Sequence, residues 1–208
     1  MNLLKNLFVV LFIGGLNTLY AQKIDPKAKR TLDMVSSNYQ SKKNICLKFS
    51  YTIGKSRTTQ NQTGIFYASK DRFRFKMMGN EQIFDGKKIY NINEEEQEIT
   101  IAKPTQNSSS LSPINYIESY KKGHHISLFS KKNNEEVIKL VPVKNNGIKQ
   151  VLLYINPTKK QVQKIEQFSN DNTLTKLIIT EYKENLTLKP NLFSFDKNLY
   201  KNYLITEL

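Results

Sequence analysis

The sequence predicts a mainly β (α+β) fold, an antiparallel barrel of about eleven strands accompanied by two helices. The first observation behind this is strict alternation of apolar and polar residues, clearest over residues 72–77. The second is the regular spacing of turn signals, such as Asp-Gly and Asn-Gly pairs, between short segments of this kind. The third is that helical spacing of apolar residues is confined to two stretches.

The first 21 residues have the features of a secretory signal peptide. Lys5 precedes an apolar run over residues 7–16, and Ala21 is the small residue at the expected cleavage point. The run is too short for a membrane-spanning helix. We therefore expect export of a chain that begins at Gln22 and forms one domain over residues 22–208.

The charge balance predicts anionic partners. Because Lys5 is the only charged residue of the signal peptide, the exported chain carries a formal net charge of +13. Such an excess favours a membrane surface or an acidic protein, and export argues against nucleic acid. Cys46 is the only cysteine, so an intramolecular disulfide is impossible and the core must stabilise the fold unaided.

The first expected helix follows the signal peptide. Asp25 is a suitable N-cap, and Pro26 fits the first helical position. The apolar stripe of this helix comprises Ala28, Leu32, Val35 and Tyr39.

The second expected helix covers residues 112–123. Ser112 caps it, Pro113 begins it, and Gly123 ends it. Its apolar stripe contains Ile114, Ile117 and Tyr120.

Period-two alternation predicts the strands, which cover residues 45–53, 60–68, 72–77, 81–84, 88–92, 98–102, 125–129, 137–141, 148–155, 161–169 and 174–182. In the C-terminal tail Phe193 and Phe195 alternate again, and we expect the tail to pack back on the sheet. A barrel of this many strands leaves room inside. A carrier of a hydrophobic ligand is therefore plausible, and an ordinary solid core is the alternative.

The residues that could support catalysis or bind metal do not converge. His124 and His125 are neighbours in a strand and point to opposite faces, so they cannot share a metal ion. Cys46 has no histidine nearby in the sequence to act as a base. Glu94, Glu95 and Glu96 are consecutive residues of a turn, not a pair facing each other across a cleft. We expect no catalytic residue, no metal and no cofactor, and hence a protein that is not an enzyme.

Several motifs, in their order along the chain, resemble a known family. These are "GIFYASKDRFRFKMM", "QIFDGKKIY", the "LSP" at the second helix, "LYINPTKK" and the terminal "FSFD". The chain resembles the periplasmic outer-membrane lipoprotein carriers of the LolA type, particularly their Bacteroidetes-like branch. The resemblance covers nearly the whole exported chain and rests on the order of the motifs, since no single one is decisive.

The resemblance implies an unclosed antiparallel β-barrel with an α-helical lid and a hydrophobic cavity for the acyl chains of lipoproteins. It implies a monomeric periplasmic carrier. Its partners would be lipoproteins directed to the outer membrane, an inner-membrane ABC-type releasing complex, and an outer-membrane acceptor or the membrane surface.

The expected acyl-chain cavity combines the apolar face of the sheet with the lid. Its lining would comprise Phe49, Tyr51, Phe73, Phe75, Met77, Tyr90, Ile114 and Ile117. Phe73 and Phe75 match aromatic positions of the family's third strand, and Tyr90 matches an aromatic after an Asp-Gly-Lys turn.

One position departs from the family pattern. Ser69, with Lys70 beside it, stands where some members carry an arginine that latches the lid. Either Lys70 substitutes for this arginine, or apolar contacts alone hold the lid.

Three other functions remain open from the sequence. The same fold could carry or sense another amphiphile, such as a glycolipid or a fatty acid. A secreted carbohydrate hydrolase would need convergent carboxylates, for which Glu94, Glu95 and Glu96 are the available residues. A structural envelope protein would have a solid barrel without a cavity.

Overall fold

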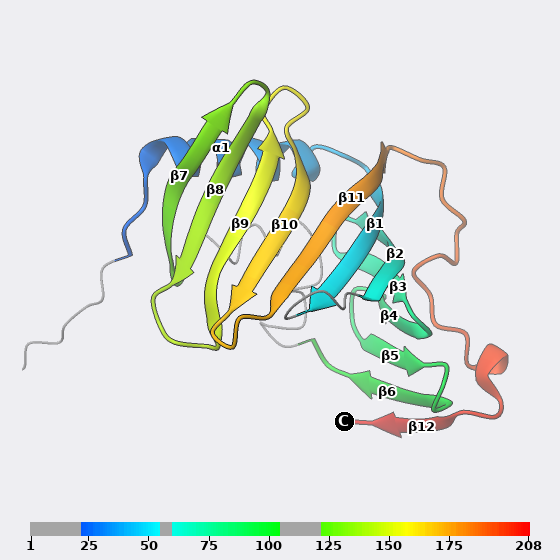
Figure 1. Ribbon diagram of the computed structural model, residues 1–208. Coiled ribbons are helices and arrows are strands. Elements are labelled where there is room, and N and C mark those ends of the chain that lie inside the picture. The colour runs from blue at the N-terminus through cyan, green and yellow to red at the C-terminus, as the bar shows by residue number, and fades with distance from the viewer. Residues whose placement is uncertain (1–21, 55–59, 105–121) are drawn as a thin grey trace, which may run out of the picture.

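The computed structural model describes residues 22–54, 60–104 and 122–208 (Figure 1). The expected signal peptide and nearly all of the second expected helix, including Ile114 and Ile117, lie outside these residues. Within them the chain forms one α-helix, α1 (Pro26–Gln40), a short 3-10 helix, η2 (Lys197–Tyr200), and a single sheet of twelve strands. None of the described helices is long and apolar enough to cross a membrane.

The strands of this sheet are β1 (Ile45–Gly54), β2 (Gln60–Ser69), β3 (Arg72–Met77), β4 (Asn80–Phe84), β5 (Ile89–Asn93), β6 (Glu98–Ala102), β7 (His124–Lys132), β8 (Glu135–Pro142), β9 (Ile148–Asn156), β10 (Gln161–Ser169), β11 (Leu174–Glu184) and β12 (Leu204–Glu207). Their order is β12-β6-β5-β4-β3-β2-β1-β11-β10-β9-β8-β7. The strands β7 and β12 lie at opposite ends, so the sheet is unclosed. The predicted mainly β, unclosed fold is confirmed, and each of the eleven predicted strands corresponds to one of β1–β11.

Two antiparallel meanders, β1–β6 and β7–β11, join where β1 pairs with β11. The β1–β11 register shifts between Lys48 and Phe49, and the β9–β10 register shifts between Val162 and Lys164. A third shift lies in the β7–β8 pair, between Leu128 and Ser130. Such bulges bend a strand and increase its twist. They account for the strong curvature of the sheet in Figure 1.

The strand β12 was not predicted, and it pairs parallel with β6, Ile205 lying opposite Ile99. Phe193 and Phe195 lie outside the strands, in the segment between β11 and β12. Phe193 is buried, with the Arg72 guanidinium 5.4 Å from its ring centre. The tail does pack back on the sheet, as expected. A parallel pair needs a long connection; the chain from β6 to β12 passes through β7–β11, and residues 185–203 lead from β11 to the edge at β6.

The start of α1 is fixed by Asp25. Its Oδ1 accepts a hydrogen bond from the Lys27 amide at 2.8 Å, and its Oδ2 accepts one from the Leu128 amide at 3.1 Å. These backbone hydrogen bonds, the one from Leu128 first, hold the pKa of Asp25 below its usual value. One carboxylate thus caps the helix, as predicted from the sequence, and also connects the helix to β7.

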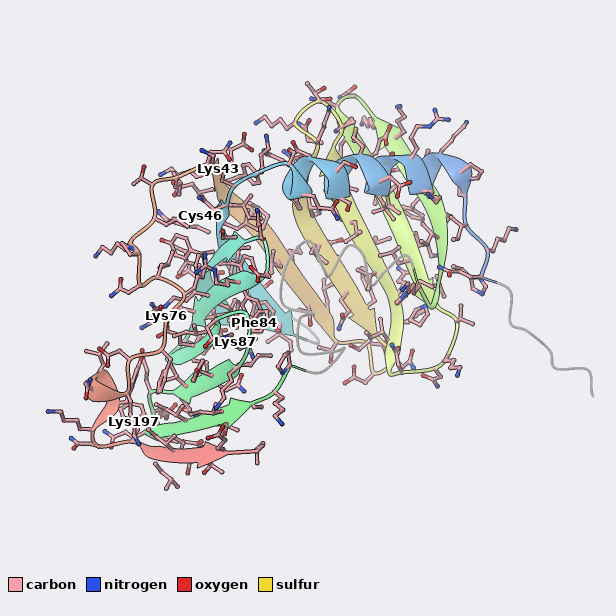
Figure 2. All side chains as sticks on the ribbon, turned by 180° about the vertical axis from the view of Figure 1, so that it is seen from behind. Lys43, Cys46, Lys76, Phe84, Lys87 and Lys197 are labelled. Carbon is pink, nitrogen blue, oxygen red and sulfur yellow. The ribbon has the colours of Figure 1, made fainter. Side chains whose placement is uncertain are left out.

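The apolar stripe of α1 packs on β7–β10. Ala28, Leu32 and Val35 have no exposed surface. They contact the fully buried side chains of these strands, Ile138, Leu140, Val151, Leu153 and Ile155. Figures 1 and 2 show the helix lying across these strands on one side of the sheet, which we call the helix face; the other side is the outer face. This packing makes α1 part of the core.

Candidate functional site

A second apolar cluster lies on the helix face, beside the part that α1 covers. In the sheet register, Leu177 of β11 lies opposite both Ile165 of β10 and Tyr51 of β1, so all three share that face. We call this group the aromatic cluster. Its buried members are Ile45, Leu47, Phe49, Phe66, Ala68 and Phe73, and its half-buried members are Tyr51, Phe75, Met77, Phe84, Leu177, Ile179 and Tyr182.

The structure brings five of the predicted cavity residues into this cluster. Phe49 and Phe73 are 4% and 2% exposed, whereas Tyr51, Phe75 and Met77 are half-buried. The first two therefore form the floor of the cluster, and the other three present apolar surface above it. Ile114 and Ile117 lie outside the described residues, so their place in the cavity stays a prediction.

Ring contacts connect the strands of the cluster. The rings of Phe49 and Phe75 stack at 5.9 Å with an interplanar angle of 9°. Phe73 contacts the rings of Phe66 at 5.9 Å and Phe84 at 5.6 Å. Offset and tilted aromatic pairs are favourable beyond their buried area. The arrangement gives a continuous aromatic surface from β1 to β4.

Sequence reasoning missed several members of the cluster for two different reasons. Phe66 and Phe84 stand at alternating positions of predicted strands, so the same period-two pattern could have identified them. Leu177 and Ile179 belong to β11, which joins the site only because it pairs with β1. No local pattern shows that long-range pairing.

Tyr90 is not part of the aromatic cluster. It lies opposite Ile83, which lies opposite Arg74, and Arg74 is on the outer face. Its hydroxyl donates to Asp85 Oδ2 at 3.0 Å, and its ring stacks on Phe195 at 4.5 Å. The family resemblance predicted that Tyr90 lines the cavity, but its side chain lies on the opposite face of the sheet. The pairing of β4 with β5 determines on which face each β5 side chain lies.

The outer face of β4–β6 is covered by the C-terminal tail. Ile83, Ile92 and Ile99 are buried there under aromatic and aliphatic residues of the tail, namely Phe195, Tyr200, Tyr203 and Ile205. Arg74 Nη1 donates to the Leu192 carbonyl at 3.0 Å and holds the tail in place. The tail therefore does not cover the aromatic cluster. Figure 2 shows Phe84 and Lys76 on opposite sides of this part of the sheet.

Charged side chains of β1–β4 lie on the outer face. Arg74 pairs with Glu81, which is buried, and Lys76 Nζ lies 2.6 Å from Glu94 Oε1. Lys183 and Lys48 lower the pKa of Glu181 to about 2 through hydrogen bonds and charge. No member of the aromatic cluster is a charged residue. The helix face of β1–β3 is therefore suited to apolar ligands.

The aromatic cluster ends at a polar boundary on β4 and β5. Gln82 lies opposite Phe75, and Asn91 lies opposite Gln82. Gln82 Nε2 donates to Asn91 Oδ1 at 2.5 Å, while the buried Gln82 Oε1 has no hydrogen-bond partner among the described residues. An unpaired buried oxygen disfavours contact with a purely apolar group. The apolar surface therefore extends from β11 to β3 and the end of β4.

Gly64 determines how Phe49 sits in the cluster, and we predict that Gly64→Ala is harmful. A Cβ at position 64 would stand 2.3 Å from Phe49 Cζ and 3.0 Å from the Lys76 carbonyl oxygen. The ring is packed against Phe75 and cannot move freely. We expect a loss of about 1–3 kcal/mol in the free energy of unfolding, measured by urea denaturation. Ser50→Ala, at a position of β1 on the outer face, is the control for this variant. It should change the free energy of unfolding by less than about 0.5 kcal/mol. Gly147→Ala would not serve, because the positive φ of Gly147 makes any side chain there strained.

The side chains considered for catalysis occupy structural positions. His125 Nδ1 accepts a hydrogen bond from the Lys23 amide at 2.9 Å. Cys46 is buried on the side of β1 opposite the aromatic cluster, and burial raises the pKa of its thiol. Glu94, which pairs with Lys76, lies with Glu95 and Glu96 in the turn between β5 and β6. Residues 22–54, 60–104 and 122–208 contain no group of three or more His, Cys, Asp or Glu that could hold a metal ion.

Comparison with known proteins adds to this geometry. A family model described as "Outer membrane lipoprotein carrier protein LolA" matches residues 48–196. Among solved structures, an uncharacterized conserved protein from Thermus thermophilus superposes with a TM-score of 0.60 at 14% identity, over 88% of this chain and 99% of that one. MucB superposes with a TM-score of 0.50 at 10% identity, over 83% and 64% of the two chains. At such identities these structures support the fold alone. No curated protein matches the chain.

Proposed function

Because this chain belongs to the family of the outer membrane lipoprotein carrier protein LolA, we propose that it binds acyl chains of lipoproteins in the periplasm and carries them from the inner to the outer membrane. The observation that carries this proposal is the aromatic cluster. It places half-buried Tyr51, Phe75 and Met77 on one uncharged face of the sheet, beside the helix-covered core. A ligand that contacts this surface must itself be apolar.

The energetics of an acyl chain suit a carrier without an ATP site. Burying a chain contributes about 0.8 kcal/mol per CH₂ group, so a sixteen-carbon chain gains on the order of 12 kcal/mol when fully buried. A carrier that bound so tightly would not release its cargo. The polar boundary at Gln82 and Asn91 limits the apolar surface and so limits burial. Partial burial keeps transfer between partners reversible.

The basic surface fits the proposed partners. Lys23, Lys27 and Arg30 are exposed at the start of α1, and the exported chain has a formal net charge of +13. Such a surface favours acidic proteins and anionic head groups. We propose that it contacts an inner-membrane ABC-type releasing complex, and then an outer-membrane acceptor or the membrane surface. The protein would act as a monomer and without a cofactor.

Native mass spectrometry tests the proposal. The protein is purified from its own periplasm without detergent, and the masses of bound molecules are measured. We expect a population that carries a triacylated lipoprotein. A Phe75→Glu variant purified in the same way should be free of this cargo, because a carboxylate would stand within the aromatic cluster.

Other outcomes would count against the proposal in different ways. If free lipid or glycolipid were bound without lipoprotein, the assignment of the acyl-binding surface would stand, but the cargo would be that lipid and not a lipoprotein. A bare mass for the protein, together with failure to bind a sixteen-carbon acyl probe in solution, would remove the carrier function altogether.

A further inference from the structure

A pocket of about 240 Å³ lies at the C-terminal end of α1. This volume is many times what a single water molecule needs. The end of α1, the start of β1, the end of β2 and the turn before β3 supply its walls. The lining residues are Tyr39, Gln40, Lys42, Asn44, Ile45, Ala68 and Lys70.

The pocket shares part of its wall with the aromatic cluster. Ile45 and Ala68 lie opposite each other in β1 and β2, and both belong to that cluster. Tyr39 belongs to the core beneath α1, and its ring lies 6.0 Å from that of Tyr182, which contacts both groups. The pocket therefore lies where the proposed acyl-binding surface meets the helix. A molecule whose chain lies on the aromatic cluster can place its other end here.

Two of the polar side chains in the wall are already paired. Asn44 Nδ2 donates to the Leu186 carbonyl at 2.9 Å, and Asn44 Oδ1 accepts from the Leu186 amide at 2.9 Å. Lys42 Nζ lies 2.8 Å from Glu184 Oε1, and Glu184 Oε2 accepts from the Tyr182 hydroxyl at 3.0 Å. These bonds fix the wall, and Glu184 compensates the charge of Lys42.

Lys70 provides an uncompensated positive charge at the pocket. Its side chain is exposed and forms no ion pair within the described parts of the chain. Its acidic neighbour Asp71 lies toward the β4–β5 turn, where a Cβ built on Gly86 would stand 3.4 Å from Asp71 Oδ2. The Ser69 hydroxyl donates to the Lys43 carbonyl at 3.1 Å and anchors the turn that carries Lys70. The pocket thus combines an apolar wall with one available ammonium group.

We propose that this pocket binds the anionic oxygen head group of an amphiphile whose chain lies on the aromatic cluster, with Lys70 as the counter-ion. The inference rests on the proposed function for the chain-binding surface, and it adds a charge preference for the ligand. An ammonium group beside a phosphate or carboxylate oxygen forms a charge-assisted hydrogen bond, which is stronger than a neutral one. An uncharged head group would gain no such bond. Among amphiphiles with the same chain, those with an anionic head group are therefore bound more tightly than those with an uncharged one.

The test compares two ligands that differ in the head group alone, decyl phosphate and decanol, by titration calorimetry below the concentration of micelle formation. We expect the protein to bind decyl phosphate about tenfold more tightly than decanol. Lys70→Ala should remove this difference and leave decanol binding unchanged, and Lys70→Arg should restore it. Lys43→Ala is the matched control, because Lys43 is close to the pocket in the chain but does not line it; this variant should keep the preference.

Each contrary outcome has a distinct meaning. If Lys70→Ala and Lys43→Ala reduced the preference for decyl phosphate equally, the preference would come from the general surface charge and not from the pocket. Equal binding of both ligands to the unmodified protein would overturn the head-group inference and leave the proposed function standing. Failure to bind either ligand would remove both. Displacement of decyl phosphate by millimolar inorganic phosphate would make the pocket a site for the free ion, whereas we expect no displacement.

Discussion

Phe75→Glu is expected to weaken binding of a sixteen-carbon acyl chain by about 30-fold or more while leaving the protein folded. Phe75 is half-buried in the centre of the aromatic cluster, stacked on Phe49, and no charged residue belongs to that cluster. A bound chain would lie against a carboxylate that has no partner. Desolvating such a group costs about 2 kcal/mol or more, which corresponds to this change in Kd. Fluorescence of an acyl-chain probe measures the Kd.

Phe129→Glu is the matched control for this experiment. Phe129 is 60% exposed at the β7–β8 bulge, outside the aromatic cluster, and its ring centre lies 5.8 Å from Lys139 Nζ. The same substitution there should leave acyl binding within about twofold of its original value. The acyl-binding surface would be wrongly assigned if Phe75→Glu retained full affinity, or if both variants lost it equally. Urea denaturation of each variant separates loss of binding from loss of folding.

Leu32→Ala is expected to lower the free energy of unfolding by about 2–5 kcal/mol. Leu32 is fully buried between α1 and the sheet, and removal of its side chain leaves a cavity against residues that are themselves fully buried. Since domains of this kind are stable by only about 5–15 kcal/mol, this is a large part of the total. The urea midpoint should fall while the slope of the transition stays the same.

This second prediction decides whether α1 is a fixed wall or a movable cover. Arg30→Ala is its control, since Arg30 is exposed on the same helix and its replacement should cost less than about 0.5 kcal/mol. A loss below about 1 kcal/mol for Leu32→Ala, with a shallower transition, would mean that α1 opens independently of the sheet. The Asp25 cap, bonded to the Leu128 amide of β7, argues for the fixed wall.

Local signals predicted most elements of the fold because their causes are local. Asp25 and Pro26 define the start of α1 by capping chemistry, and the structure begins the helix at that point. The alternation of Phe73, Phe75 and Met77 with basic residues placed all three on one face of β3, as observed. The strand β12 escaped prediction because it pairs with a strand about a hundred residues earlier in the chain and has little pattern of its own.

Part of the candidate site was predicted from the sequence. The residue that was misplaced was misplaced because the pairing register between strands could not be read from the sequence. Within one strand, alternation fixes which residues share a face, so the residues predicted from β1 and β3 lie together on one face; their contact with acyl chains stays a prediction. Which residues of two neighbouring strands share a face depends on the turn that connects the strands. The β4–β5 turn puts Tyr90 on the outer face, against Phe195, although its sequence position looked equivalent to that of the other aromatics.

The sequence by itself determined the mainly β fold, the capped helix α1, and the separation of apolar from charged residues along each strand. These properties depend on neighbouring residues and on the conformational preferences of single side chains. The tertiary structure alone decided that β11 joins β1, that the tail covers the outer face of β4–β6, and that Lys70 lines one pocket with Tyr39 and Ile45. Contacts of this kind join residues far apart in the chain. They depend on register and on the packing of the whole sheet, which no short stretch of sequence contains.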